Sequence, residues 1–463
     1  MKVLLINPPS PQATKYFSSP PLGLMYLASA LRRHHHEVNI LDLFSSGREY
    51  EKIGWLLQKG QVDIVGITGM SFQHHSIVET AKTVKEINPK IPILVGGSHS
   101  SALPGLLLKN ENIDFAIRGE AEYSFPFFIK ELETSNEWDS VSGLCFKKDG
   151  AIQIGSSEIV KDIDSLPIPA WDLIEFRKYA GSPHGFFYEK LPIGQIVTSR
   201  GCPYLCSFCG AHIIHSRRWR GHSPDRVMDE VDYLVKELGI HELHIEDDNF
   251  SLDILRAKII LTRIIEKKYN LSIAFPNGIR IDRLDDELLQ LMKDAGVYSI
   301  TFGIESGSPR IIEHVHKKIS LEFLEHQIKK VRRYGFYCHG FFIIGFPYER
   351  REDIELTIHY AKKLDLDAAF FGTYVPLPGS ADFNDLLEKK RIDIDRMNWD
   401  QMFSVYVQDV SFFLTAQEIK KYQKLANLRF YLRPKILLRL LMRIRGIHHL
   451  WTFISRLKST ISS

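Results

Sequence analysis

Three cysteines in one short segment are the residues with the clearest chemistry in this sequence. Cys202, Cys206 and Cys209 lie in SRGCPYLCSFCGAH, directly after an apolar run that predicts a strand. Thiolates are the natural ligands of iron–sulfur clusters. Three cysteines can hold three of the four irons of a 4Fe–4S cluster, which leaves one iron open to an external ligand. The spacing therefore predicts a metal centre with an open coordination position.

A structural zinc site is the alternative interpretation of these cysteines. Zinc usually takes four protein ligands, often from paired Cys-x2-Cys knuckles, and the nearest candidates for a fourth ligand are His212 and His215. The remaining cysteines, Cys145 and Cys338, lie far away in the sequence, and we expect them to be buried and inert. Five cysteines in 463 residues argue against a disulfide scaffold and indicate a reducing compartment.

The overall composition limits which kinds of molecule we expect the protein to bind. Hydrophobic residues make up 44% of the chain and charged residues 25%, which is typical of a globular protein. The net charge of +3 gives no argument for a nucleic-acid partner, and we expect none. The N-terminal MKVLLINPPS lacks the apolar region of a secretory signal, and no apolar run is long enough for a membrane span. We therefore expect a cytoplasmic protein.

The first third of the chain alternates short apolar runs with helical patterns. This alternation predicts a parallel sheet with helices on both faces, that is, a doubly wound, Rossmann-like domain over residues 1–134. The expected strands are 2–6, 37–41, 62–68, 91–97 and 113–119. The expected helices are 22–33, 48–59, 74–88 and 101–108.

The rest of the chain divides into three further parts. Residues 135–190 predict a hairpin around Asp149-Gly150 and a proline-punctuated linker. From 191 to 390 six strand candidates alternate with helices, which fits a partial (β/α)6 barrel. Residues 391–463 are helical and basic. The predicted fold class is therefore α/β, with two parallel-sheet domains and a helical tail.

The cysteine spacing, with Phe208 before the last cysteine, is similar to the signature of the radical S-adenosylmethionine (SAM) enzymes. In that family SAM chelates the open iron through its amino and carboxylate groups. Electron transfer from the cluster then cleaves SAM to methionine and a 5′-deoxyadenosyl radical, which abstracts hydrogen. The resemblance implies that the three cysteines hold a 4Fe–4S cluster.

Further segments within 193–385 resemble the same family in its order. They imply SAM contacts at the ends of successive barrel strands, by Asp247, Asp248, Arg280, Glu305 and Gly345. Each position also has a plainer interpretation. The two aspartates could cap a helix, Arg280 could form a surface salt bridge, and Gly345 could simply make a turn.

A Rossmann-like domain before such a barrel resembles the cobalamin-binding subfamily. The resemblance implies contacts to cobalamin at the carboxyl ends of the strands, by Asn7, Pro8, Pro9, Thr68, Ser71, Gly96, Gly97 and His99. The absence of Gly-x-Gly-x-x-Gly argues against a dinucleotide. Asp-x-His-x-x-Gly is also absent, which implies a cobalt without a protein histidine. A domain that keeps this fold without the cofactor is the alternative.

The C-terminal tail has an amphipathic pattern. Lys435, Arg439 and Arg443 fall on one helical stripe, and the opposite face is apolar: Ile436, Leu437, Leu440, Leu441 and Ile444. One interpretation is a helix on the inner, anionic membrane surface, anchored by Trp451 and Phe453, which would suit a lipid-like substrate. The other is a helix packed on the barrel with its basic stripe in water.

Together these features predict an enzyme that methylates an unactivated carbon of a small-molecule substrate, as class B radical SAM methyltransferases do. SAM would be both radical source and methyl donor, with cobalamin carrying the methyl group and flavodoxin or ferredoxin as the electron donor. One alternative is a cyclisation, ring contraction or oxidation, similar to anaerobic magnesium-protoporphyrin ester cyclase. The other is an iron–sulfur or zinc scaffold without turnover.

Overall fold

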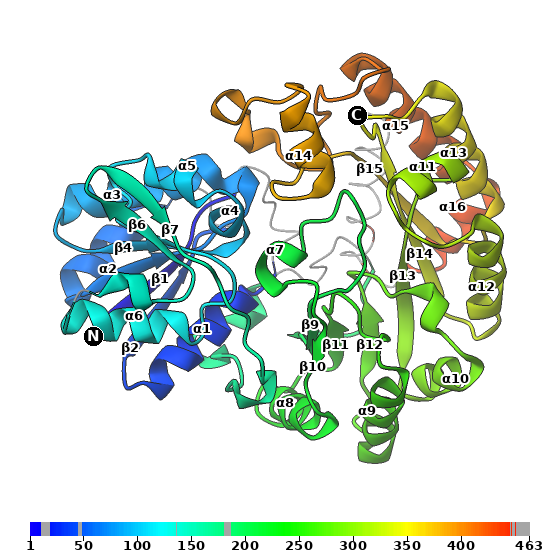
Figure 1. The fold of residues 1–463 in the computed structure, drawn as a ribbon. Coiled ribbons are helices and arrows are strands. Elements are labelled where there is room, and N and C mark those ends of the chain that lie inside the picture. Colours follow the sequence, from blue (N-terminus) through cyan, green and yellow to red (C-terminus); the bar gives the residue numbers. More distant parts are fainter. Residues whose placement is uncertain are drawn as a thin grey trace.

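The structure is a computed structural model with two large, mainly parallel sheets, which lie on opposite sides of the molecule (Figure 1). It describes residues 1–10, 19–44, 49–135, 137–179, 187–444, 446 and 450. Trp451 and Phe453, the membrane anchors predicted from the tail, lie outside the described residues.

The N-terminal sheet has seven strands in the order β2-β1-β3-β4-β5-β6-β7. Its parallel strands are β1 (Lys2–Asn7), β2 (Glu37–Asp42), β3 (Ile64–Ile67), β4 (Ile93–Val95) and β5 (Phe115–Ile117). The helices are α1 (Leu22–Arg33), α2 (Glu51–Gly60), α3 (His74–Ile87), α4 (Gly97–Ala102), α5 (Pro104–Leu108) and α6 (Ser124–Glu133).

Alternation along the strands produces the two faces of this sheet. Val3 and Leu5 pack with α1 and α6, whereas Leu4 and Ile6 pack with α2, α3 and α5. Successive side chains of a strand point to opposite faces, so a fully apolar strand must be covered on both sides. The predicted doubly wound domain is confirmed.

The hairpin β6 (Leu144–Lys148) and β7 (Ala151–Ile154) extends this sheet. Asp149 and Gly150 both have positive φ, 53° and 77°, as the predicted two-residue turn requires. The sequence placed this hairpin in the connecting segment, but β6 pairs antiparallel with β5. The pairing satisfies the backbone groups that β5 would otherwise leave exposed at the edge of the sheet. The N-terminal sheet therefore continues beyond residue 134.

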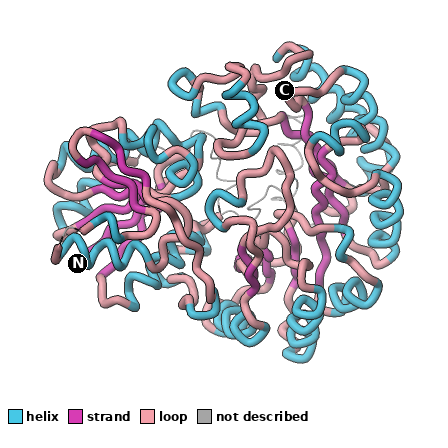
Figure 2. Tube along the Cα trace, viewed as in Figure 1, coloured by secondary structure: helices cyan, strands magenta, loops and turns pink. Residues whose placement is uncertain are grey.

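The second sheet has six strands in the order β15-β14-β13-β12-β11-β8, and every pairing is parallel. The strands are β8 (Ile193–Ile196), β11 (Glu242–Ile245), β12 (Ser272–Phe275), β13 (Val297–Glu305), β14 (Tyr337–Ile344) and β15 (Ala368–Thr373). In the order given, β8 and β15 do not pair, so the barrel is open, as predicted. Figure 2 shows the helices on the outside of this curved sheet.

Capped helices alternate with the barrel strands. They are α8 (Pro224–Lys236), α9 (Ile254–Lys267), α10 (Asp286–Asp294), α11 (Pro309–His314), α12 (Leu321–Arg333) and α13 (Arg351–Lys363). Ser223, Asp253 and Asp285 each accept a hydrogen bond from a backbone N–H of the first turn, which fixes where the helix begins. Short 3-10 helices occur in the connections at Trp138–Ser140, Ile163–Ser165, Trp171–Leu173, Phe176–Lys178 and Ile281–Arg283.

The C-terminal region covers the last barrel strand and then returns across the molecule. It contains α14 (Ala381–Glu388), two 3-10 helices, η7 (Ile394–Arg396) and η8 (Trp399–Gln401), α15 (Ala416–Tyr431) and α16 (Pro434–Leu441). The helix α15 packs against β15, and η8 packs against the N-terminal domain (Figure 1). In the described part of the chain, no helix is long and apolar enough to cross a membrane.

The helix α16 packs on the barrel, as one interpretation of the tail sequence predicted: Ile436 and Leu440 of the predicted apolar face are buried in the barrel core. The basic stripe, however, does not lie only in water, because Lys435 and Arg439 pair with Asp365 and Arg443 pairs with Glu189. Leu438, Leu441 and Met442 are 58%, 51% and 67% exposed. Acidic residues from distant segments therefore hold the basic stripe, and the sequence of α16 alone does not contain them.

Candidate functional site

A small hairpin positions the cysteine loop. The strands β9 (Ser199–Arg200) and β10 (Arg220–Gly221) pair antiparallel and bracket the loop, and α7 (His212–His215) lies between them. The loop is fixed to the barrel at Ser207, whose N–H donates to Val315 O at 3.2 Å and whose carbonyl accepts from Asp382 N–H at 3.0 Å. Phe208 packs edge-to-face on Phe346 at 5.9 Å. The hairpin, α11 and α14 thus order one loop.

The thiols lie among charged side chains from several strand ends. Burial raises the pKa of Cys202 and Cys206, and raises that of Cys209 to about 11. The cations Lys317 and Arg280 lie near enough to Cys206 to lower its pKa in part. An iron–sulfur cluster binds thiolates, and nearby cations stabilise the negative charge that three thiolates bring. The loop therefore fits the cluster that the spacing predicted.

The zinc alternative needs a fourth ligand beside the three cysteines. His215, one of the two candidates, is held away from that role at one nitrogen, because its Nδ1 donates to Glu120 Oε1 at 2.7 Å.

The acidic pair at the end of β11 divides into two environments. Asp247 is buried, and its carboxylate accepts from Thr198 N–H at 2.5 Å and from the hydroxyls of Thr198 and Ser199 at 2.6 and 2.5 Å. Asp248 is exposed, and its charge raises the pKa of Cys202 and Cys209. Asp248 therefore faces the cysteine site, whereas Asp247 anchors the segment that leads into the cysteine loop.

The different environments of Asp247 and Asp248 predict different effects of their substitution on stability. We expect Asp247→Ala to lower the free energy of unfolding by about 1–3 kcal/mol, because it leaves Thr198 N–H buried without a partner. Asp248→Ala should change it by less than about 0.5 kcal/mol, because that side chain is exposed. Urea unfolding of the cofactor-free protein compares them, and equal effects would contradict the division.

Arg280 and Glu305 also lie near the cysteines. The Arg280 guanidinium stacks on the ring of Tyr204, 3.6 Å from its centroid, and its Nε donates to Asp282 at 2.9 Å. Glu305 is buried, has a positive φ of 66°, and accepts from Lys317 Nζ at 2.6 Å. Such a backbone conformation is uncommon for a residue other than glycine. Lys317 and Tyr204 were not predicted, because neither belongs to a spacing pattern of its own.

Gly345 makes a turn that requires glycine. Its φ is 88°, and a Cβ atom there would lie 2.9 Å from Ile419. Its N–H donates to Glu349 Oε2 at 2.5 Å. Glu349 is completely buried, and burial raises its pKa to about 8. The turn interpretation of Gly345 is thus correct in the structure.

The predicted cobalamin contacts gather at the carboxyl edge of the N-terminal sheet. Gln73 Nε2 donates to Asn7 Oδ1 at 3.4 Å and to Pro8 O at 2.8 Å, which joins the ends of β1 and β3. Gly97 has a φ of 90°, and a Cβ there would lie 2.8 Å from Thr68 Oγ1. The loops after β3 and β4 thus approach more closely than any side chain at Gly97 would allow.

His99 supports this edge from inside. It is completely buried; its Nδ1 lies 3.2 Å from Ser71 Oγ, and its Nε2 lies 2.9 Å from His74 Nδ1. Burial lowers the pKa of His99 to about 3 and that of His74 to about 4, so both rings are neutral at pH 7. Both nitrogens of His99 are engaged, so it orients Ser71 and His74 and has no nitrogen left for cobalt. This agrees with the missing Asp-x-His-x-x-Gly.

The C-terminal region contributes residues to the same edge that sequence reasoning missed. Trp399 packs against the rings of His74 and His99, with centroids 5.5 and 5.0 Å apart, and Asp400 lies 2.9 Å from His75 Nδ1. Trp399 is buried in a cluster with Phe72 and Met402. More than 300 positions separate the two segments along the chain, so only folding reveals the contact.

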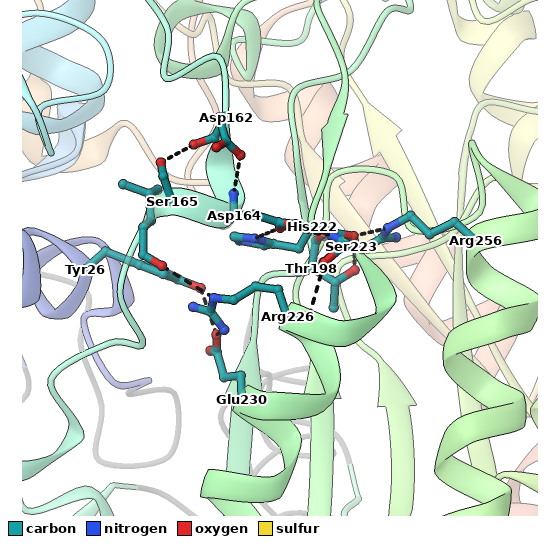
Figure 3. A network of polar contacts seen from close by, with 12 residues as sticks. Tyr26, Asp162, Asp164, Ser165, Thr198, His222, Ser223, Arg226, Glu230 and Arg256 are labelled. Atoms are coloured by element: carbon teal, nitrogen blue, oxygen red, sulfur yellow. Dashed lines mark hydrogen bonds and ion pairs between the residues drawn. The ribbon is translucent and has the colours of Figure 1, made fainter.

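The two domains are joined by buried polar contacts near the cysteine hairpin. Tyr26 of α1 donates to Glu230 of α8 at 3.5 Å, and Arg226 donates to the same carboxylate at 2.9 Å. Figure 3 shows these side chains. Asp164 of the connecting segment lies 3.0 Å from His222 Nδ1. In addition, α4 at the cobalamin edge packs against α7 beside the cysteines. The two predicted cofactor sites are therefore neighbours.

Known proteins resemble the chain in both halves. Residues 196–361 match the radical SAM superfamily and residues 13–128 match the B12 binding domain. An uncharacterized methyltransferase of Pyrococcus horikoshii is 36% identical over 450 residues, covering 95% of this chain and 94% of that protein. The cytidylyl-2-hydroxyethylphosphonate methyltransferase of Streptomyces wedmorensis is 30% identical over 448 residues, covering 85% and 83%.

A solved structure shows the same architecture. The cobalamin-dependent SAM radical enzyme OxsB, with aqua-cobalamin and SAM bound, superposes with a TM-score of 0.75 at 16% identity, covering 99% of this chain and 72% of that one. This agreement confirms the predicted fold from end to end. With both matches in the predicted places, and with methyltransferases similar along most of its length, the chain belongs to the radical SAM enzymes that carry a B12-binding domain.

Proposed function

We propose that the protein is a cobalamin-dependent radical SAM methyltransferase that adds a methyl group to an unactivated carbon of a small molecule. The observation that carries this proposal is the packing of α4, at the cobalamin edge, against α7, which follows Cys209. A methyl carrier and a radical generator must reach the same substrate carbon, so their sites have to adjoin. The similarity to two methyltransferases along most of the chain supports the same reaction class.

Some residues of the chain would bind the cluster and SAM, and others would orient the binding residues. Cys202, Cys206 and Cys209 would hold the cluster, and the exposed Asp248 would attract the amino group of SAM. Arg280, fixed on Tyr204, would pair with the SAM carboxylate, since a planar guanidinium suits that group. When bound, the cofactors supply the electron, the radical and the methyl group.

Residues at strand ends in both domains would bind the remaining groups of SAM and cobalamin. The Lys317–Glu305 pair would present a carboxylate oxygen to hydroxyl groups of SAM, and the Gly345 turn would expose backbone to its adenine. In the N-terminal domain the cobalamin contacts would come from Asn7, Pro8, Pro9, Thr68, Ser71, Gly96 and Gly97, oriented from behind by His99.

The test begins with anaerobic purification from cells supplied with cobalamin. We expect about four irons and about one cobalt per chain. The reduced protein, given SAM with a deuterated methyl group and a small-molecule extract of the source cells, should form 5′-deoxyadenosine and one product carrying that methyl group. A product that loses hydrogen and gains no label would indicate cyclisation or oxidation. Absence of 5′-deoxyadenosine would indicate a scaffold.

We propose flavodoxin or ferredoxin as the physiological electron donor. Support comes from the partial exposure of all three cysteines, which leaves the cluster loop near the surface. Mixing the oxidised protein with prereduced flavodoxin should produce the electron paramagnetic resonance (EPR) signal of a reduced cluster. No signal with either donor, although dithionite produces one, would contradict the proposal.

We further propose that α16 makes the peripheral membrane contact, through its apolar side. Leu438, Leu441 and Met442 are more than half exposed, whereas Lys435 and Arg439 are held by Asp365. We therefore expect equal binding to neutral and anionic vesicles, and loss of binding in Leu441→Ser. Binding that depends on anionic lipid would favour the basic stripe instead, and no binding would remove this support for a lipid-like substrate.

A further inference from the structure

The hairpin that brackets the cysteine loop carries two buried arginines. Arg200 lies in β9, before Cys202, and Arg220 lies in β10, after the loop. They are only 4% and 7% exposed. A buried guanidinium needs a partner because desolvation of an unpaired charge costs several kcal/mol. The carboxylate partners of both arginines come from the other domain.

Glu120 is the centre of these contacts. It follows β5 of the B12-binding domain, and its side chain is 1% exposed. Arg220 Nη1 and Nη2 donate to its two carboxylate oxygens at 2.7 and 2.8 Å, a bidentate geometry. His215 of α7 donates to it at 2.7 Å, and Val160 N–H donates at 2.6 Å.

The second arginine is bound by the same segment of the N-terminal domain. Arg200 Nη2 lies 2.7 Å from Glu122 Oε1, and its Nη1 lies 3.6 Å from Glu120 Oε1. Burial alone would raise the pKa of Glu120, but the hydrogen bonds from His215 and Arg220 and the charge of Arg200 outweigh it and hold that pKa well below its ordinary value. Glu120 is therefore ionised at neutral pH.

We infer that Glu120 is a positioning residue for the iron–sulfur site, supplied by the B12-binding domain. It holds Arg200, Arg220 and His215, which flank the cysteine loop along the chain, and so sets the conformation in which the thiols bind the cluster. It also balances the charges of the two arginines in the hairpin that brackets this loop. Docking of one cofactor's domain thereby controls the stability and the reduction potential of the other cofactor. The inference rests on the proposed cluster but not on methyl transfer.

The test compares Glu120→Gln with Glu230→Gln in the full chain, reconstituted anaerobically without SAM or cobalamin. Glu230 is a matched control, because it is equally buried, pairs with Arg226 and meets Tyr26 across the same domain boundary, whereas no described hydrogen bond or ion pair joins it directly to the hairpin. We expect Glu120→Gln to lose iron to a chelator roughly 10-fold faster than wild type, as for other residues that orient metal ligands. Glu230→Gln should retain iron as wild type does.

The direction in which the cluster potential shifts distinguishes an effect of charge from a general loosening of the structure around the cluster. In an EPR-monitored titration, Glu120→Gln should shift the cluster potential to more positive values, because Arg200 and Arg220 lose their counter-charge. Arg220→Gln should shift it to more negative values, and the double variant should lie between them. A structural defect alone would move both single variants in the same direction.

Three outcomes overturn the inference. The first is a Glu120→Gln variant that retains iron, and has a cluster potential, as wild type does. The second is equal iron loss in Glu120→Gln and Glu230→Gln. The third is a shift in cluster potential of the same sign in Glu120→Gln and Arg220→Gln. A wild-type protein that holds no cluster under any condition would instead overturn the proposed function, and this inference with it. Complete loss of the cluster in Glu120→Gln, with retention in Glu230→Gln, supports the inference even where no potential can be measured.

Discussion

Cys206→Ala should abolish cluster binding and reduce SAM cleavage to the background of the uncatalysed reaction. Each of the three thiols supplies one iron ligand, and two thiolates cannot hold a cluster that also needs an open iron. The measurements are iron and sulfide content, the visible absorption spectrum, and 5′-deoxyadenosine formation after reduction. This is the largest effect we expect from any single substitution, because it removes the radical source.

Cys145→Ala is the matched control for this substitution. Its thiol is completely buried in the N-terminal sheet, and Cys145 Sγ donates to the Gly143 carbonyl at 3.6 Å. We expect this variant to keep its iron and its SAM cleavage. If Cys206→Ala retained about four irons, or if Cys145→Ala lost them, the assignment of the ligands would be wrong.

Glu349→Gln should stabilise the protein increasingly as the pH rises from 5 to 8. Burial raises the pKa of Glu349 from 4.5 to about 8, so the folded state holds this proton more tightly than the unfolded state does. The stability that protonation contributes is complete below pH 4.5 and is lost as the pH rises towards 8. At pH 7 the loss is about 3 kcal/mol, and glutamine, which stays neutral, avoids it.

Urea unfolding of the cofactor-free protein at several pH values measures this effect. The variant and wild type should be similar near pH 5 and diverge towards pH 8. Glutamine can still accept the hydrogen bond from Gly345 N–H, so the turn is preserved. Glu352→Gln, at an exposed position of α13, is the control and should follow wild type throughout. A constant difference across the whole range would show that Glu349 does not carry a buried proton.

Much of the site could be predicted because its signals are local. The three cysteines are close in sequence, so their spacing alone identifies them as ligands of one centre. The strands were predicted because short apolar runs bounded by turn signals are typical of buried strands. The resemblance to radical SAM enzymes placed Asp248, Arg280 and Glu305 near the cysteines before any contact was known, and parallel strands that end at one edge explain why such residues meet.

The assignments that the sequence left open depend on residues far apart in the chain. Asp247 and Asp248 are adjacent, and only the position of Thr198 shows which of them is buried. The direction in which α16 packs depends on Asp365, and the burial of His99 depends on Trp399. Hydrophobic periodicity does not reveal such pairs, because their members lie far apart in the chain.

The sequence by itself therefore determined the fold class and, through its resemblance to the radical SAM enzymes, predicted the cluster ligands and the edge where each cofactor site lies, because spacing and hydrophobic periodicity are properties of short segments. Only the tertiary structure decided which charged side chains meet, including Glu120 with the two arginines beside the cysteine loop. The physical reason is that a buried charge is tolerated only where a partner is brought to it, and that partner is chosen by the packing of whole domains.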